Sequence, residues 1–458
     1  MLDLAFFGFF AGLFLIGFKR PFVWILAYIC VDIVAPQKIS WGILNIIPIS
    51  LLTFIAAFAG WLLFDNKKDA RFTYRQFLML LLLIYCGYTT MGSAFPESAM
   101  FKWGWVWKAF LFAIFLPLAL RTKLRIETTL LVMVLSVGAI VISGGIKTIL
   151  GGGGYGQLRL LVDNNTGLYE GSIISTVAIS IIPLVLYLVK HNTIFPEDWR
   201  VKLFAAGLIF ACCLMPIGTT ARTGLVCLAV LAILLLRSTR RRFLYLALIG
   251  AAGAMTVPFL PQTYLDRMST IRDHESDTSA STRIAVWMWT LDYVKKHPMG
   301  GGFDAYKAND LRFKTTVTEQ VGGATVVTQK VVEDESRAYH SSYFELLGEQ
   351  GYPGFMMWAW LHLAGLWQME VLRRRWKKRT GAGEQWQAPL ANALQQCQIV
   401  YLAGAAFVGI GYQPFALLIV AVQCGLWSYL KRLDQEAAEQ RRKAPAKQEL
   451  RPAGVLAH

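Results

Sequence analysis

The chain has 458 residues, of which 55% are apolar and 16% charged, and its formal net charge at pH 7 is +16. Its apolar residues form run after run, and about 20 residues suffice to cross the hydrocarbon core of a bilayer. A soluble protein could not bury so many runs of that length. The composition therefore predicts an all-α polytopic membrane protein with short connections and excludes an ordinary soluble domain.

The positive charge is concentrated in short connections between apolar runs. Basic residues cluster at 19–20, 67–75, 121–125, 237–242, 373–379 and 431–432. Cytoplasmic loops carry an excess of Lys and Arg, so these loops and the C-terminal tail are predicted to be cytoplasmic. We interpret the positive charge as what orients the chain in the membrane, and we predict no nucleic-acid partner.

The apolar runs predict about 12 or 13 membrane-spanning helices, since the first two are short and could form one shallow hairpin. The first run lacks a small-residue cleavage site and is interpreted as a retained helix. The predicted spans are 2–18, 22–35, 44–64, 76–92, 105–120, 128–143, 168–189, 201–217, 225–236, 243–260, 355–372, 399–412 and 415–430.

This pattern divides the chain into four parts. Residues 1–260 form the N-terminal transmembrane helices, 261–352 a large loop, 353–430 the C-terminal transmembrane helices and 431–458 a cytoplasmic tail. If the tail is cytoplasmic and each span crosses the membrane once, the large loop lies on the non-cytoplasmic face. The polar segments at 36–43, 93–101 and 144–167 are predicted to lie on the same face.

The large loop and the tail have patterns of their own. Ile284, Trp287, Leu291 and Val294 recur at helical spacing, which predicts an amphipathic helix over 281–296 that lies on the membrane or caps the bundle. The Val- and Thr-rich stretch 315–332, with glycines in its middle, predicts a β-hairpin. The charged tail after Leu433 is predicted to be disordered.

Several isolated features have simpler interpretations. The aromatic and basic stretch 101–108 is typical of an anchor at the bilayer interface. Glu170, near the start of a span, is predicted to line a polar cavity because a carboxylate there needs a partner or water. The seven cysteines all lie in apolar runs, so we predict neither disulfides nor a cysteine-bound metal.

Three basic residues converge on the predicted outer face. Arg222 lies in the turn at 218–224, at the outer end of a span, Arg283 begins the amphipathic helix, and His340 closes the large loop. An arginine at a membrane edge can simply snorkel to the interface. The three together favour a functional site, since ionisable groups at the membrane are functional candidates by default.

The order and spacing of these elements resemble the O-antigen ligase and polymerase superfamily. Its ligase signature is His, then Asn, Ser or Gln, nine residues and Gly-x-x-Gly, which His340-Ser341 and Gly351–Gly354 match in full. Residues 220–224 resemble its Ser-Arg-Gly turn, with Ala221 in place of the serine and one extra threonine. Residues 281–287 and 297–303 resemble its two middle elements, and 163–165 a further one. Parts of the large loop also resemble exosortase-associated putative O-glycosylation ligases.

The resemblance implies a GT-C-like membrane glycosyltransferase of the bacterial inner membrane with a periplasmic active site. It also implies an undecaprenyl-diphosphate-linked O-antigen donor and a lipid A-core acceptor. Because arginine binds phosphate oxygens bidentately, we predict that Arg222 and Arg283 bind the diphosphate. Further substrate-binding candidates are Arg267, Arg272, Asn164, Asn165 and Ser341.

A neutral imidazole titrates near working pH, so His340 is the predicted general base for the attacking hydroxyl. Direct displacement would invert the anomeric carbon. No Asp-x-Asp pair stands on the outer side of the sequence, so we predict transfer without a metal or other cofactor, with arginines stabilising the leaving group. Glu345 and Glu349 either orient the imidazole or serve the structure.

Two other classes of function stay open. One is another transferase of the superfamily, either an O-antigen polymerase or a protein O-oligosaccharyltransferase. A single dominant outer loop and a short tail favour the ligase over both. The other class is a lipid-linked-sugar transporter, which would place polar residues near mid-span, often in repeated halves.

Overall fold

In the computed structural model the chain is a helical bundle with one β-hairpin. The structure describes residues 2–40, 42–67, 70–150, 167–237, 278–321, 324–379, 381 and 383–443. The predicted span 243–260 lies outside these residues. The helices of the first half are α1 (Leu2–Lys19), α2 (Phe22–Val34), α3 (Pro36–Ile39), α4 (Ile43–Ile46), α5 (Ile49–Phe64), α6 (Tyr74–Met91), α7 (Pro96–Ala119), α8 (Lys123–Leu150) and α9 (Gly171–His191).

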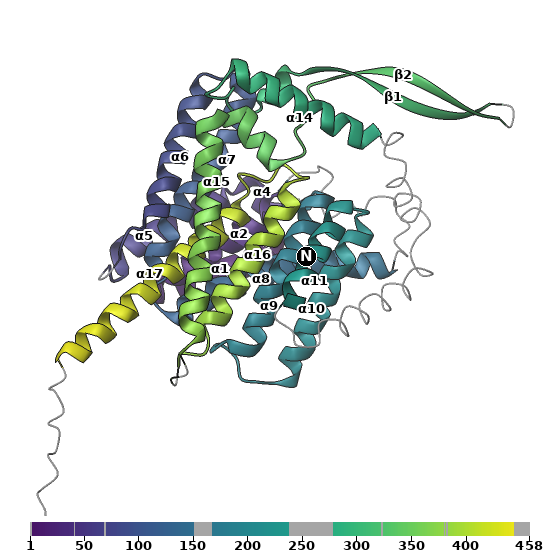
Figure 1. The fold of residues 1–458 in the computed structure, drawn as a ribbon. Helices are drawn as coiled ribbons and strands as arrows, with labels where there is room; N and C mark the ends of the chain where they lie inside the picture. Colours follow the sequence, from purple (N-terminus) through teal and green to yellow (C-terminus); the bar gives the residue numbers. More distant parts are fainter. Residues whose placement is uncertain are drawn as a thin grey trace, which may run out of the picture.

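The described part of the second half adds five helices to the bundle, one helix across its end and the hairpin. These elements are α10 (Trp199–Gly218), α11 (Arg222–Arg237), α14 (Thr278–Lys296), β1 (Asp310–Val321), β2 (Ala324–Glu335), α15 (Ser342–Lys377), α16 (Gln387–Ala405) and α17 (Pro414–Lys443). Short 3-10 helices lie at Gly167–Tyr169 and Ala305–Ala308. Figure 1 shows α14 lying across the top of the bundle, with the hairpin projecting beyond it.

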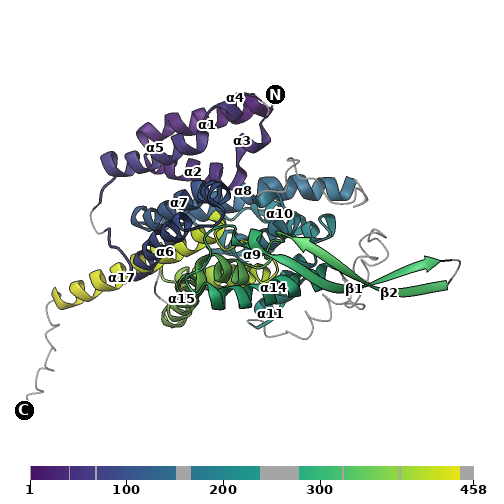
Figure 2. The ribbon, with the colours of Figure 1, turned by 90° about the horizontal axis from the view of Figure 1, so that it is seen from above.

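The centre of the bundle is α9, which packs against α16, α10 and α11, while α15 packs against α16 and α6. Seen from above in Figure 2, α1 to α5 occupy one edge of the bundle and α14 and α15 the opposite edge. The helices α7, α8, α9, α10 and α17 are long and apolar enough to cross a membrane, and four shorter apolar helices accompany them. The chain is thus a helical membrane protein. A total of about 12 spans and a GT-C-like architecture stay predictions.

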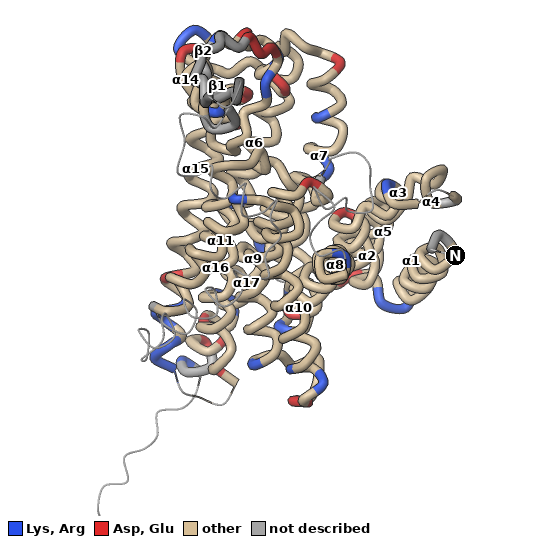
Figure 3. The backbone as a smooth tube through the Cα atoms, turned by 90° about the vertical axis from the view of Figure 1, so that its right-hand side faces the viewer, with Lys and Arg blue, Asp and Glu red and all other residues tan. Residues whose placement is uncertain are grey.

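Charged residues lie mainly at the two ends of the bundle. In Figure 3, Lys and Arg gather at the end away from α14, where short turns join the helices. This is the distribution that the positive-inside rule associates with the cytoplasmic side of a membrane.

One of the charged residues, Arg75, is fully buried. Arg75 donates from Nη1 to Gln368 Oε1 (3.2 Å) and from Nη2 to Gln423 Oε1 (2.9 Å). Gln423 in turn donates to Gln398 Oε1 (2.8 Å), whose amide nitrogen lies 2.9 Å from His362 Nδ1. These polar contacts join α6, α15, α16 and α17 where water is excluded, so each group needs its protein partner.

Some predicted boundaries differ from those of the helices. The predicted span 128–143 lies within α8, which continues to Leu150, and Gly138 and Gly145 allow this helix to pack closely against Leu208 and Ala211 of α10. The span predicted over 399–412 ends at Ala405, and the following residues form a non-helical segment at 406–413.

The tail was predicted to be disordered after Leu433, but α17 continues to Lys443. Its extension carries an i,i+4 ion pair between Arg432 and Glu436 (3.6 Å). Asp434 also binds Arg375 (2.9 Å) and Arg379 (2.8 Å), which tie the extension to the segment after α15.

The structure confirms the two kinds of element predicted for the large loop, a helix and a β-hairpin. The helix α14 covers the predicted 281–296, and β1 and β2 extend the predicted hairpin to twelve residues in each strand. The apolar residues of α14 divide between two faces: Ile284 is 58% and Leu291 38% exposed, whereas Val286 and Val294 are fully buried. Thr282 and Thr290 complete the buried face.

Candidate functional site

His340 lies in a short loop that two helices hold from either side. Its backbone has φ 47°, a left-handed conformation that is uncommon outside glycine. On α14, Trp287 Nε1 donates to the carbonyl of Tyr339 (2.9 Å), the residue before His340. The same indole stacks on Phe344 of α15, with ring centroids 4.9 Å apart. The loop is therefore fixed where the histidine stands.

Arg283 lies one helical turn before Trp287 and so projects from the same side of α14. Burial of His340, together with the charges of Arg283 and Arg337, lowers the pKa of the imidazole to about 4. The imidazole is therefore neutral near pH 7. This is the protonation state that a general base needs.

Arg337 is a residue that sequence reasoning missed. Its N–H donates to Asn309 Oδ1 (2.9 Å), and Asn309 Nδ2 donates to its carbonyl (2.8 Å). Asn309 is 2% exposed and precedes β1, so the two ends of the hairpin meet in this pair. The only signal in the sequence was a cation three residues before His340, and nothing there indicated the partner.

Arg222 begins α11, after a turn with Thr220 at φ 51°. Gly224 is required because a Cβ there would come within 2.5 Å of Pro216 Cγ and 3.0 Å of Ser175 Cβ. This explains the glycine of the turn by close packing of α11 against α9 and α10. Among the predicted basic residues, Arg283 is one whose charge lowers the pKa of His340.

The remaining predicted site residues fall into two sets. Ser341 stands next to His340 at the start of α15 and is 1% exposed. Arg267, Arg272, Asn164 and Asn165 lie outside the described residues. Glu170 caps α9 by accepting from Ile173 N–H (2.6 Å), which is where its carboxylate finds a partner.

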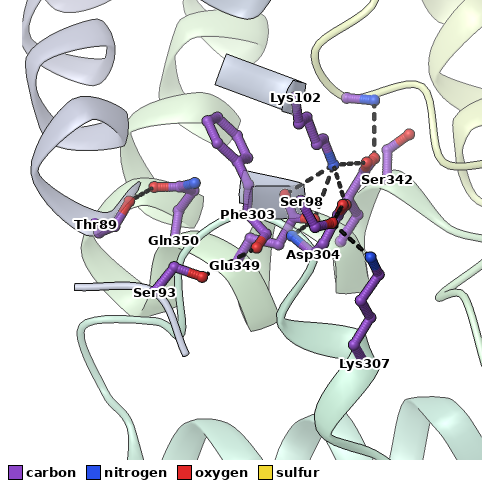
Figure 4. A network of polar contacts seen from close by, with 12 residues as sticks. Thr89, Ser93, Ser98, Lys102, Phe303, Asp304, Lys307, Ser342, Glu349 and Gln350 are labelled. Carbon is purple, nitrogen blue, oxygen red and sulfur yellow. Dashed lines mark hydrogen bonds and ion pairs between the residues drawn. The ribbon is translucent and has the colours of Figure 1, made fainter. Parts of the chain in front are cut away.

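A second charged cluster lies behind the His340 loop, around Lys102 of α7 (Figure 4). Lys102 Nζ is 2.7 Å from Glu345 Oε1, 2.8 Å from Glu349 Oε1 and 3.9 Å from Asp304 Oδ1. It also lies 4.8 Å from the ring centroid of Tyr412. The anchor interpretation was therefore wrong for Lys102, whose side chain is only 12% exposed.

The same cluster assigns a structural role to the two glutamates. Glu349 accepts from Asp304 N–H (3.0 Å), and Glu345 Oε2 accepts from Gly411 N–H (3.3 Å). Ser342 Oγ accepts from Ile410 N–H (2.8 Å), and together these contacts fix the segment 406–413 against α15. Both carboxylates face Lys102 and the protein interior. They hold the helix that follows His340.

The glycines of the signature have two different tasks. Gly351 interrupts α15 with φ 62° and ψ −165°, a region essentially restricted to glycine, and kinks the helix there. Gly354 brings α15 close to α6, since a Cβ there would lie 3.2 Å from Tyr85 Cε1. The first glycine is needed for conformation and the second for packing.

The segment 297–303, which also resembles a motif of the family, packs against α15 at the kink at Gly351. Gly301 N–H donates to the carbonyl of Gly348 (3.0 Å) and Gly302 N–H to that of Glu349 (2.9 Å). In return, Tyr352 N–H donates to the carbonyl of Pro298 (3.0 Å). Two motifs that look separate in the sequence thus form one backbone joint beside the His340 loop.

Comparison with known proteins agrees with these motifs. Residues 205–359 match the family described as O-Antigen ligase, and residues 1–193 match a family of unknown function (DUF5935). No curated protein matches the chain significantly. The match to the O-Antigen ligase family covers Arg222, Arg283, Arg337 and His340 together with the joint at Gly351.

Proposed function

Since residues 205–359 place the chain in the O-antigen ligase/polymerase superfamily, we propose that it transfers a glycan from undecaprenyl diphosphate to a sugar hydroxyl of lipid A-core. The observation that carries the proposal is a neutral His340 beside guanidinium groups on a rigid loop. The reaction belongs on the periplasmic face of a bacterial inner membrane. Both substrates are lipid-linked, so a site at the end of a membrane bundle suits them.

His340 takes the proton of the acceptor hydroxyl while that oxygen attacks the anomeric carbon of the donor sugar. The bond between this carbon and the diphosphate oxygen breaks as the new bond forms, so the configuration inverts. The diphosphate leaves with the bonding electron pair. It needs cations more than a proton, because it is already a weakly basic leaving group.

Arg222 and Arg283 are the proposed diphosphate-binding residues, as a guanidinium stays charged and binds phosphate oxygens bidentately. Arg267, Arg272, Asn164, Asn165 and Ser341 are proposed to assist in binding the substrates. The proposed transfer uses no metal ion or cofactor. Arginine side chains then supply the electrostatic stabilisation of the leaving group.

A second candidate is transfer to a protein acceptor, and the hairpin favours it. In the part of the chain that the structure describes, β1 and β2 form a two-stranded antiparallel sheet that projects beyond the bundle. Exposed strand edges can accept an extended peptide by main-chain hydrogen bonds. An acceptor polypeptide would have such an edge available near His340.

The test is transfer by the purified protein in detergent, with lipid-linked glycan as donor and EDTA present. Lipid A-core and an unfolded polypeptide are offered in separate reactions, and the anomeric configuration of the product is determined by NMR. We expect an inverted linkage to lipid A-core, unaffected by EDTA. Modification of the polypeptide alone, or lengthening of the donor glycan, would replace the ligase by another activity of the superfamily. Inhibition by EDTA would contradict the metal-free mechanism.

A further inference from the structure

We propose that Arg337 is a further donor-binding residue, which binds the diphosphate from the hairpin side while Arg283 binds it from α14. This inference rests on the proposed function, because it takes a diphosphate-linked lipid as the donor. It adds to the site a residue that neither the family resemblance nor the spacing of the motifs indicated.

The backbone of Arg337 is held in place by the base of the hairpin. Besides the paired hydrogen bonds with buried Asn309, the neighbouring Ser336 donates its N–H to the carbonyl of Asn309 (3.0 Å). Ser336 Oγ donates to the carbonyl of Lys307 (3.2 Å). A ligand-binding side chain that starts from a fixed backbone loses less conformational freedom on binding.

The guanidinium of Arg337 retains unused hydrogen-bonding capacity. Its Nη1 lies 3.6 Å from Asp334 Oδ2, which is longer than a hydrogen bond. Its Nε is buried and has no hydrogen-bond acceptor among the described residues. The side chain as a whole is 42% exposed, so an anion can reach it. A buried donor without an acceptor is costly, and an incoming phosphate oxygen would remove that cost.

A purely structural ion pair explains these features less well. Pairs between exposed side chains contribute little to stability, so Asp334 alone does not require an arginine at this position. Arg312 on β1 shows what such a pair looks like here. Its Nε lies 3.3 Å from Glu333 Oε1, and both side chains are more than 60% exposed (69% and 63%).

Binding of the donor between Arg283 and Arg337 also changes the pKa of His340. Arg283 from α14 and Arg337 from the hairpin base disfavour protonation of His340, while Asp334 offsets part of the charge of Arg337. The carboxylates of α15 face Lys102 instead. A bound diphosphate places negative charge beside the imidazole and raises its pKa, since a nearby opposite charge favours the charged form. The histidine thus becomes a stronger base once the donor is present.

The direct test is binding of undecaprenyl diphosphate without a glycan, measured by calorimetry in detergent at fixed ionic strength. Undecaprenyl monophosphate serves as the comparison ligand. We expect Arg337→Gln to bind the diphosphate about 10- to 100-fold more weakly, which corresponds to the loss of charge-assisted hydrogen bonds. Arg337→Lys retains the positive charge but lacks the bidentate guanidinium, so its affinity for the diphosphate should lie between those of Arg337→Gln and the wild type. Arg312→Gln is the matched control and should bind as the wild type does.

A second readout tests whether Arg337 stands close enough to His340 to act on the same site. In Arg337→Gln one cation near His340 is gone, so the pKa of the free imidazole rises. The acid limb of kcat/KM, which reports the free enzyme, then moves to higher pH. Arg312→Gln should leave this limb in place.

Unchanged diphosphate affinity in folded Arg337→Gln would overturn the inference. If that variant does not fold, unchanged affinity in Arg337→Lys overturns it instead. Wild-type protein that binds the diphosphate but ignores lipid A-core would refute the proposed acceptor and leave the role of Arg337 intact. Wild-type protein that does not bind the diphosphate would refute both.

Discussion

Two charged clusters lie within a few residues of one another on either side of the start of α15, and they are built in opposite ways. Around Lys102, three carboxylate groups approach one ammonium to between 2.7 and 3.9 Å, and Glu349 is fully buried. Around His340 lie the positive charges of Arg283 and Arg337, and Asp334 stands 3.6 Å from Arg337. The first cluster satisfies its charges within the protein. The second keeps hydrogen-bonding capacity for a ligand.

The difference shows how a membrane protein can place charges that are open to a ligand beside charges that stabilise the fold. A buried charge must be matched, because the cost of removing it from water is several kcal/mol. A charge at the edge of the bundle can stay partly unmatched, because solvent screens it until substrate arrives. The following predictions test this division of tasks, from the largest expected effect to the smallest.

The strongest test replaces His340 by Asn, which tolerates the left-handed backbone better than Ala. Loss of a general base should lower kcat by about 100- to 10,000-fold. The Lys102 cluster is untouched, so the midpoint of thermal unfolding in detergent should stay near that of the wild type. Transfer at the wild-type rate would remove His340 from the mechanism.

The reverse test replaces Lys102 by Met. Glu345 and Glu349 are then buried without their counter-ion, and the free energy of unfolding should fall by about 3–5 kcal/mol. Adding Glu349→Gln should recover part of this loss, because one uncompensated charge is removed. The measurement is unfolding by SDS titration in mixed micelles. If Lys102→Met alone is as stable as wild type, the cluster does not stabilise the fold.

The joint between α15 and the segment 297–303 is expected to be less costly to break. Gly351→Ala places a Cβ within 2.2 Å of the carbonyl oxygen of Pro298 and requires a backbone region that only glycine favours. We expect a loss of about 1–3 kcal/mol in the free energy of unfolding, measured in the same assay. Met299→Ala, at a position 48% exposed, is the control and should change little.

The smallest expected effect is a difference between two pH profiles of the wild type. In the free enzyme the pKa of His340 is about 4, so kcat/KM should fall only as the pH drops toward that value. Bound diphosphate raises this pKa, so the acid limb of kcat should lie higher, by roughly one pH unit. Coincident limbs would show that donor binding leaves the imidazole unchanged.

The sequence predicted the class of the fold and singled out His340 as a candidate, but it predicted few of the contacts around them. Apolar runs and basic turns depend on local composition, which a single sequence displays directly. Partners distant in the chain do not show in this way. Lys102 resembled an interfacial anchor because its neighbours are tryptophans, whereas its carboxylate partners lie more than 200 residues away.

The buried face of α14 illustrates a second limit. Ile284 and Leu291 are apolar yet exposed, whereas Thr282 and Thr290 are buried beside the valines of this helix. Thr290 Oγ1 donates to the carbonyl of Val286 in the same helix (2.7 Å), which makes it acceptable in the interior. A periodicity based on hydrophobicity cannot anticipate that. The position of Arg337 escaped prediction for a related reason, since its placement depends on Asn309 across the hairpin.

The backbone joint at Gly351 has a consequence for the variation that this protein can tolerate. Its hydrogen bonds use main-chain atoms only, and the neighbouring side chains of Met299 and Tyr352 are 48% and 45% exposed. A saturation library across 297–303 and 348–354 should therefore show two kinds of position side by side. The glycines admit almost no replacement, whereas Met299 and Tyr352 accept many. The shape of the main chain holds the joint together, so these two side chains stay available for new contacts with lipid or substrate.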